Sequence, residues 1–466
     1  GLRSSHRLTD SDAKAAALAI EAGLDVILPW NWSDKVREAV EKGYLSVEAL
    51  DRAVLRILTA KFRLGLFDGP YRDPGKANGV VRCDEHRRLA LEAARESIIL
   101  LKNEGVLPLE KRSTRRIGVF GQSANLIPIG SNYSGPYGAP WQGEDAPTPL
   151  EALRAYFGGE AEIVSGDSDE IETLAPGCDV SLYFTSILEG EGSDRSDLRL
   201  PSISVSRTRK DDGGIIVDET EQKVTENQES DILKLCRVSP KTVVILENGA
   251  PIDMTAWIGA VPAVIEAWYP GEQGAKALVE ILFGDVNPSA KLPVTIPKTV
   301  GQLPLNYSYK PSGRGYGYCD NDGRPMYPFG FGLSYTTFAV KNARVAAGEN
   351  GVAVTFEIEN TGGRAGTQVV QLYVGSHDCD VVRPVKELKA YKRVTLGPGE
   401  RRTVELALAP QDFCYYDRGM NYGLHDGCHT LMLGTSSDDI AAEFEIAVRN
   451  GVISSAARNT QNATRE

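Results

Sequence analysis

Apolar residues in the middle of the chain form short continuous runs of strand length, with helical patterns between them. The four clearest runs lie at residues 115–122, 178–186, 241–249 and 263–271. Strands that are apolar on both faces and alternate with helices are typical of a mostly parallel sheet covered by helices on both sides. We therefore expect an α/β domain, in which functional side chains follow the carboxyl ends of the strands.

A helical pattern leads into this domain, and we expect one helix over residues 86–103. The first 75 residues hold three further helical patterns, at 12–22, 33–43 and 46–67. Ser33 and Ser46 are candidate N-caps. Between the first two patterns the run GLDVILPW, residues 23–30, predicts a strand. One strand with flanking helices cannot bury its own faces, so this segment needs a partner sheet.

From Phe338 onward the pattern changes to period two. Apolar and polar residues alternate in five runs, at 352–360, 368–375, 403–409, 429–434 and 442–448. Such strands, with turns and no helices between them, predict a β-sandwich over residues 338–449. The tail at 450–466 is rich in Ser, Ala, Asn and Thr, and we expect it to be disordered or loosely attached.

Charge restricts the partners of the chain. The formal net charge is −12, and the acidic residues are spread along the sequence. Nucleic acids and anionic membranes are bound by basic surfaces, so we expect neither as a partner. No stretch is long and apolar enough to predict a membrane span. A neutral or polar small substrate fits this charge better.

Cysteine and histidine do not form a strong metal-binding pattern. The seven cysteines are scattered without a CxxC pair, so we expect buried or free thiols with at most a local disulfide, such as Cys414 with Cys428. His425, Cys428 and His429 form the metal-like grouping, but they lie inside a β-rich segment and lack the spacing of a zinc site. We expect no metal and no organic cofactor.

Seven stretches carry a resemblance to a known family. They are AGLDVILP (22–29), ESIILLKNEGVLPL (96–109), EGEGSDR (189–195), WYPGEQG (268–274), NPSAKLPVTIP (287–297), YPFGFGLSYTTF (327–338) and RPVKELKAYKRVTLGPGE (383–400). Together and in this order they resemble glycoside hydrolase family 3, the β-glucosidase and β-xylosidase family. The resemblance implies a (β/α)8 barrel, an α/β sandwich and a fibronectin type III-like domain. It also implies hydrolysis with retention, through one carboxylate on each of the first two domains.

The resemblance divides the chain into six expected segments. They are the C-terminal part of the barrel (1–75), a linker and entry helix (76–112), the α/β sandwich domain with the acid/base loop (113–310), a connector (311–337), the fibronectin type III-like domain (338–449) and a flexible tail (450–466).

The barrel nucleophile of the family is an aspartate in a Ser-Asp-Trp motif, and no such motif occurs at the start of this sequence. Counting back from Asp25 places it at or before Gly1. We therefore expect only the last βα unit of the barrel here, with the nucleophile supplied by a missing or separate N-terminal barrel portion. Asp10, Asp12 and Asp25 are weaker substitutes, because the first two are interpreted as helix-capping acids and the third as a strand residue.

The family's acid/base is a Glu followed by Gly, one further residue and Asp-Arg, and Glu191 begins a match to this pattern. The resemblance therefore assigns the acid/base role to Glu191. Glu189 lies two residues earlier and could instead fill the role or raise the pKa of Glu191. The plain alternative is a solvated acidic loop without chemistry. Asp194 and Arg195 are expected to form a local ion pair.

A glycine-rich segment at 129–145 contains Tyr133, Tyr137 and Trp141. Sugars stack their apolar ring faces on aromatic side chains, so these three are candidate substrate-binding residues on the aglycone side. The alternative is that they pack the segment onto the sheet. The segment is similar to a loop of the β-xylosidase-like members of the family, which favours xylosides slightly.

The sequence thus predicts part of a retaining exo-β-glycosidase acting on an oligosaccharide or aryl β-glycoside. A β-glucosidase is the first expectation and a β-xylosidase the second. The alternative from another class is a non-catalytic carbohydrate-binding or scaffolding subunit. The β-sandwich is expected to tie the domains together or to support a homodimer, and an extracellular or periplasmic location is slightly favoured.

Overall fold

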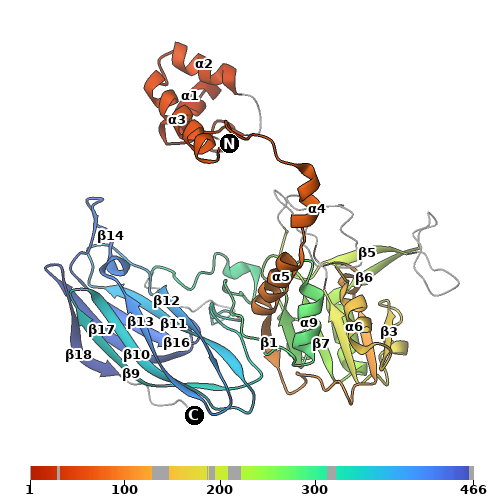
Figure 1. Cartoon of the computed structure of the whole chain (residues 1–466). Coiled ribbons are helices and arrows are strands. Elements are labelled where there is room, and N and C mark those ends of the chain that lie inside the picture. Colours follow the sequence, from red (N-terminus) through yellow and green to blue (C-terminus); the bar gives the residue numbers. More distant parts are fainter. Residues whose placement is uncertain are drawn as a thin grey trace. The chain divides into compact units, whose positions relative to one another are not determined.

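The computed structural model describes residues 2–28, 32–127, 146–185, 187, 195–207, 222–311 and 322–460. The chain divides into two compact units, Gly1–Cys83 and Asp84–Glu466. The first is helical, and the second combines an α/β domain with a β-sandwich (Figure 1).

The first unit is built around three helices, with a short 3₁₀ turn and one further helical turn after them. They are α1 (Asp12–Glu21), α2 (Ser33–Glu41), α3 (Val47–Arg63), η1 (Pro74–Lys76) and α4 (Ala77–Val80). Ser46 caps α3 as predicted, because its hydroxyl accepts a hydrogen bond from the amide of Ala49 at 3.1 Å. Ser33 is not an N-cap: the helix begins at Ser33 itself, and Trp32 occupies the cap position without a side-chain bond.

The strand predicted at residues 23–30 is not formed in the part that the structure describes. Residues 24–28 carry no strand assignment, and Leu24, Val26 and Leu28 are exposed. A strand requires a neighbour for its backbone hydrogen bonds, and the described residues of this unit include no other strand. The core of the unit is small and rich in alanine, and it consists of Ala13, Ala17, Ile20, Ala39, Leu45, Ala49 and Ala53.

The α/β domain contains a six-stranded sheet in the order β1-β8-β7-β4-β2-β3. Its strands are β1 (Ile99–Asn103), β2 (Arg116–Phe120), β3 (Glu162–Gly166), β4 (Val180–Phe184), β7 (Thr242–Leu246) and β8 (Ala263–Glu266). All neighbours are parallel except β1, which runs antiparallel to β8. The four runs predicted as parallel strands are confirmed as β2, β4, β7 and β8.

The single helix predicted at residues 86–103 is wrong in its second half. Helix α5 (Asp84–Ser97) ends before Ile98, and the next residues form β1. Ile99, Leu100 and Leu101 are all buried. Successive side chains of a strand point to opposite faces, so an edge strand buries all three between helices on the two sides of the sheet.

Helices cover both faces of this sheet. On one face lie α5, α6 (Pro149–Phe157) and α9 (Gly274–Leu282), as Figure 1 shows. The other face packs on α7 (Ile171–Leu174), α8 (Gln228–Val238) and the segment from Ile252 to Val261. A separate antiparallel ribbon consists of β5 (Ser202–Arg207) and β6 (Gln222–Asn227).

The C-terminal domain is the predicted β-sandwich, with its core between two antiparallel sheets. One sheet has the order β13-β10-β9 and the other β12-β11-β16-β17-β18. The strands are β9 (Phe338–Gly348), β10 (Gly351–Asn360), β11 (Gly366–His377), β12 (Glu387–Leu396), β13 (Arg401–Leu408), β16 (Gly427–Gly434), β17 (Ile440–Arg449) and β18 (Val452–Thr460), and a small ribbon joins β14 (Tyr415–Tyr416) to β15 (Tyr422–Gly423).

The tail expected to be loose from Asn450 onward instead begins with an ordered strand. Residues Val452–Thr460 form β18, which pairs with β17. Asn450 and Gly451 both have positive φ, 51° and 76°. An Asn-Gly pair in this conformation is the preferred two-residue hairpin turn. The composition of the tail hid this signal.

Candidate active site

The candidate site begins at the carboxyl edge of the parallel sheet, where β4 and β7 end side by side. Thr185 follows β4 and is fully buried. Its amide donates to the carbonyl of Ile245 at 3.0 Å, and its hydroxyl accepts from the amide of Glu247 at 3.2 Å. The residue that follows β4 is therefore fixed to β7 and to the residue after it.

The chain that returns from the acidic stretch is fixed to the segment after β7 as well. The guanidinium of Arg195 donates to the carbonyl of Pro251 at 2.9 Å. Three residues later, the carbonyl of Leu198 accepts from the amide of Asp253 at 2.8 Å. Both flanks of residues 186–194 are thus held at the carboxyl end of β7, which is the edge where the sequence predicts function.

The predicted site residues themselves lie outside the described residues. This holds for the two candidate acids and their neighbour, Glu189, Glu191 and Asp194, and for the three aromatic residues Tyr133, Tyr137 and Trp141. Their roles stay predictions, as does the ion pair of Asp194 with Arg195.

Glu247 is a buried carboxyl group at this edge that sequence reasoning missed. It follows β7 directly, and its side chain is almost fully enclosed. Burial raises the pKa of Glu247 well above its ordinary value, and a hydrogen bond with Ser123 opposes this shift. Its Oε1 has no hydrogen-bond partner within the described part of the chain. Such an environment favours the protonated acid over the carboxylate.

Glu266 at the end of β8 is the second buried carboxyl group of the edge. Its two oxygens accept from the side-chain amide of Asn248 at 3.2 Å and from the backbone amide of Trp268 at 2.9 Å. The carboxyl group thereby joins the segment after β7 to the segment after β8. Trp268 has a positive φ of 55°, a conformation that its bond to Glu266 holds in place.

Close backbone packing brings the end of β2 against the end of β4. Gly121 has a φ of +87°, and a Cβ at this position would lie 2.1 Å from the carbonyl oxygen of Phe184. Only glycine fits both the conformation and the contact. The segment that leads to residues 128–145 therefore starts directly beside the strand that leads to residues 188–194.

A cavity of about 310 Å³ lies farther along the same edge, beyond β8. It is lined by Glu96, Ser97, Trp268, Ala290, Lys291, Pro293, Val369, Tyr391 and Arg393. Arg393 of the β-sandwich pairs with Glu96 of the α/β domain at 2.8 Å, and Lys291 donates to the carbonyl of Gly332 at 2.6 Å. Burial lowers the pKa of Lys291 to about 8. Apart from Val369, the lining residues come from four of the seven family-like stretches, and they join the two domains.

The metal-like grouping seen in the sequence is not brought together. His429 points into the sandwich core, where its Nδ1 lies 3.0 Å from the hydroxyl of Ser376, while His425 binds the carbonyl of Asn421. Cys428 lies on the opposite side of its strand from His429, because neighbouring residues of a strand alternate. Cys414 and Cys428 are free thiols, so the suggested local disulfide is absent.

Three aspartates near the start of the chain were weighed as substitutes for the nucleophile. Each of them is held by a basic side chain: Asp10 by Lys14 at 2.9 Å, Asp12 by Arg3 at 3.0 Å and Asp25 by Arg56 at 2.5 Å. These pairs give all three residues a local structural role.

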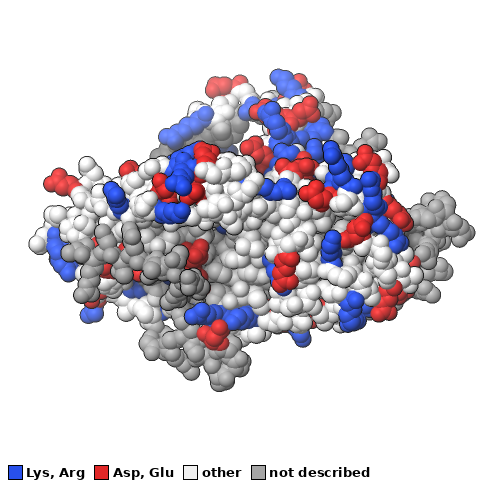
Figure 2. All heavy atoms as spheres, turned by 90° about the horizontal axis from the view of Figure 1, so that it is seen from below, with Lys and Arg blue, Asp and Glu red and all other residues white. Residues whose placement is uncertain are grey.

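The surface carries both signs of charge. On the face shown in Figure 2, acidic and basic side chains are interspersed over the described residues. The described residues on that face form no basic stripe of the kind that binds nucleic acid. Among the described residues, no helix has the length and apolar character required to cross a membrane.

Comparisons with known proteins agree with this architecture. Residues 98–335 match the glycosyl hydrolase family 3 C-terminal domain, and residues 368–437 match a fibronectin type III-like domain. A β-xylosidase of Formosa agariphila is 31% identical over 94% of this chain and 62% of its own length. A periplasmic β-glucosidase of Salmonella typhimurium is 30% identical over 91% of this chain and 59% of its own.

A solved structure has the same fold. The β-glucosidase of Erythrobacter marinus superposes with a TM-score of 0.81 at 33% identity, over 96% of this chain and 62% of that one. The chain thus spans about three fifths of the length of these relatives. The family match covers all six strands of the sheet and the edge with Thr185, Glu247 and Glu266, and on these grounds the chain belongs to glycoside hydrolase family 3.

Proposed function

We propose that this chain is the acid/base-bearing part of a retaining exo-β-glycosidase that removes terminal β-linked sugars, with β-glucosides as the first substrate class. The observation that carries the proposal is the attachment of both flanks of residues 186–194 to the segment that follows β7, Thr185 to Glu247 and Arg195 to Pro251. Both flanks of this segment therefore lie at the edge where α/β domains of this kind bind ligands.

Within this segment, Glu191 acts first as acid and then as base. It protonates the oxygen of the leaving group, and it later removes a proton from the water that hydrolyses the glycosyl-enzyme. A general acid needs a raised pKa near neutral pH. Glu189 is two residues away, and its negative charge contributes to such a rise if both side chains face the same space.

The nucleophile in this proposal is an aspartate of an N-terminal barrel portion that joins the first unit. Exposed apolar side chains on that unit support the idea, because a surface so rich in large apolar groups is typical of an interface. They include Leu18, Leu24, Val26, Leu28, Leu55, Phe62, Leu64 and Phe67. The relatives contain additional chain length that can supply such a partner segment.

β-Xylosides are the second substrate class, and a specific observation favours keeping it. The relatives include proteins named β-xylosidase as well as β-glucosidase. Tyr133, Tyr137 and Trp141 are the side chains that we propose to contact the aglycone. An extracellular or periplasmic location is the proposal for the compartment, supported by the periplasmic relative.

The acid/base role is tested by comparing two leaving groups in the active enzyme. Glu191→Gln is expected to lower kcat/KM for an alkyl β-glucoside by about 10²–10⁴-fold. Its effect on a dinitrophenyl β-glucoside should be much smaller, because that leaving group departs without a proton. Glu189→Gln is the matched control and should retain most of its activity on both. Equal losses on both substrates, or a larger loss with Glu189→Gln, would contradict the assignment.

A further inference from the structure

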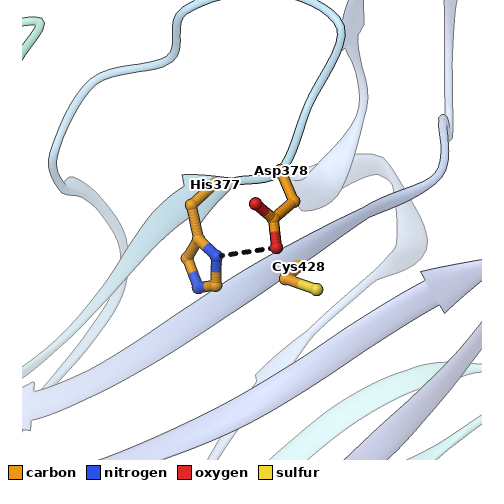
Figure 3. A group of neighbouring side chains, drawn as sticks. All are labelled: His377, Asp378 and Cys428. Carbon is orange, nitrogen blue, oxygen red and sulfur yellow. Dashed lines mark ion pairs between the residues drawn. The ribbon is translucent and has the colours of Figure 1, made fainter.

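A histidine, an aspartate and a cysteine meet on the outer face of the β-sandwich, at the end of the β11–β16 pair. His377 is the last residue of β11, Asp378 follows it, and Cys428 is the residue of β16 that pairs with His377. One ligand atom of each lies within 4.8 Å of those of the other two. Figure 3 shows the imidazole and the carboxylate side by side, with the thiol of the adjacent strand beside them.

The strand register explains why these residues meet while the grouping expected from sequence does not. Directly paired residues of neighbouring strands point to the same face. His377 therefore shares the outer face with Cys428, and their neighbours Ser376 and His429 share the inner face. The positive φ of Asp378, 55°, turns the chain at the end of β11, and its carboxylate lies 3.7 Å from Nδ1 of His377.

The other nitrogen of His377 is held by a second carboxylate. Its Nε2 lies 3.3 Å from Glu445 on β17, and Glu445 also accepts from the hydroxyl of Thr430 at 2.8 Å. A histidine that binds a metal through one nitrogen usually donates the other N–H to a carboxylate, which fixes the orientation of the ring. His377 has this arrangement, with Nδ1 on the side of Asp378.

We propose that His377, Asp378 and Cys428 form a binding site for a zinc ion, oriented by Glu445. Nitrogen, sulfur and carboxylate oxygen are the donors that zinc accepts, at about 2.0–2.3 Å. Tetrahedral ligands at these distances are about 3.3–3.8 Å apart, so the three side chains need to close by about 1 Å. Water fills the fourth position. The ion clamps the start of the β11–β12 connection to β16.

One side chain competes with the ion. The guanidinium of Arg449 lies 3.5 Å from the sulfur of Cys428 and is exposed. Binding requires it to turn away, which costs little for an exposed arginine.

The test is a titration of the untagged, metal-free full chain with Zn²⁺ by calorimetry, and with Co²⁺ by absorption, since a cobalt–thiolate bond gives a charge-transfer band. We expect one ion per chain and a thiolate band. Cys428→Ser should abolish the band, and His377→Ala should abolish stoichiometric binding. Glu445→Gln should weaken binding by about 10–100-fold.

Cys379→Ser is the matched control, because this thiol is the neighbour of Asp378 and its sulfur contacts the carbonyl of His377. It should bind both ions as the wild type does. Circular dichroism of each variant verifies that the sandwich is folded. The proposal is overturned if the wild-type chain takes up no stoichiometric ion, if His377→Ala binds as tightly as wild type, or if the band is lost in Cys379→Ser rather than in Cys428→Ser.

Discussion

Two apolar runs of similar sequence reach opposite states in the two units. Residues 24–28, LDVIL, leave Leu24, Val26 and Leu28 exposed at 43%, 54% and 79%. In β7, TVVIL, every side chain is 0% exposed. β7 lies between β4 and β8 and has packed layers on both faces. An apolar run therefore indicates a need for burial, and neighbouring strands decide whether that need is met.

The largest expected effect on stability comes from shortening a buried side chain of β7. Shortening an exposed side chain in residues 24–28 is the comparison. Ile245→Ala should lower the free energy of unfolding of the α/β domain by about 2–5 kcal/mol, because it leaves a cavity in a packed layer. Val26→Ala should change the stability of its unit by less than about 0.5 kcal/mol. Urea unfolding followed by hydrogen exchange of peptides from each unit measures both values.

The two variants Ile245→Ala and Val26→Ala also test whether an N-terminal barrel portion joins the first unit. In the enzyme that contains the barrel portion, residue 26 should become buried, and Val26→Ala should then cost about 1 kcal/mol or more, as burial of a valine side chain requires. If Val26→Ala lowers the stability of the complete enzyme no more than that of this chain alone, the barrel portion does not cover residues 24–28.

A smaller effect on the free energy of unfolding is expected when a glycine of positive φ is replaced by alanine, with one such glycine tested in each unit. Gly23 has a φ of +102° with nothing within 4 Å of its Cβ position, whereas Gly121, at +87°, faces the carbonyl of Phe184. Gly23→Ala should cost about 1–2 kcal/mol through backbone strain alone. Gly121→Ala adds a backbone clash and should cost about 3 kcal/mol. If thermal unfolding shows the same loss of stability for both variants, the close approach of β2 to β4 does not contribute to stability.

The buried Glu247 should make the stability of the α/β domain depend on pH. Its pKa is raised in the folded chain by burial, so the folded state binds the proton more tightly than the unfolded state. This stabilisation is fully present below the unfolded pKa, about 4.3, and is lost as pH rises through the folded pKa. Glu247→Gln removes the titration. In denaturant titrations between pH 4 and 8, the wild type should lose stability relative to this variant. If the stabilities of both proteins change with pH in the same way, the pKa of Glu247 is not raised.

The comparison also explains what the sequence could predict. The strands β2, β4, β7 and β8 were predictable because continuous apolar runs are typical of buried parallel strands. Strand β1 was not, because ILLKN continues the helical pattern of the residues before it, and only pairing with β8 decides its state. The turn at Asn450 and Gly451 was missed although Asn-Gly is a strong hairpin signal, because the composition of the residues after it suggested a loose tail.

For the candidate site, the sequence predicted the edge of the sheet where functional residues should lie, but it did not reveal all the acidic residues at that edge. The carboxyl ends of the strands were the expected place, and Thr185 and Arg195, which flank the acidic stretch, are bonded there. The roles of Glu189 and Glu191 stay predictions. Glu247 and Glu266 went unnoticed, although each is an acid at the end of an apolar run. Their burial depends on Ser123, Asn248 and other residues distant in sequence, and no local pattern reveals such partners.

The most direct test of the central claim is covalent trapping of the active enzyme with 2,4-dinitrophenyl 2-deoxy-2-fluoro-β-glucoside, followed by mass analysis of its peptides. The label should sit on an aspartate of the barrel portion, outside residues 1–466, while Glu191 stays unlabelled and its Ala variant regains activity with azide as the incoming nucleophile. A label on any carboxylate within residues 1–466 would contradict the division of the catalytic pair proposed for this chain.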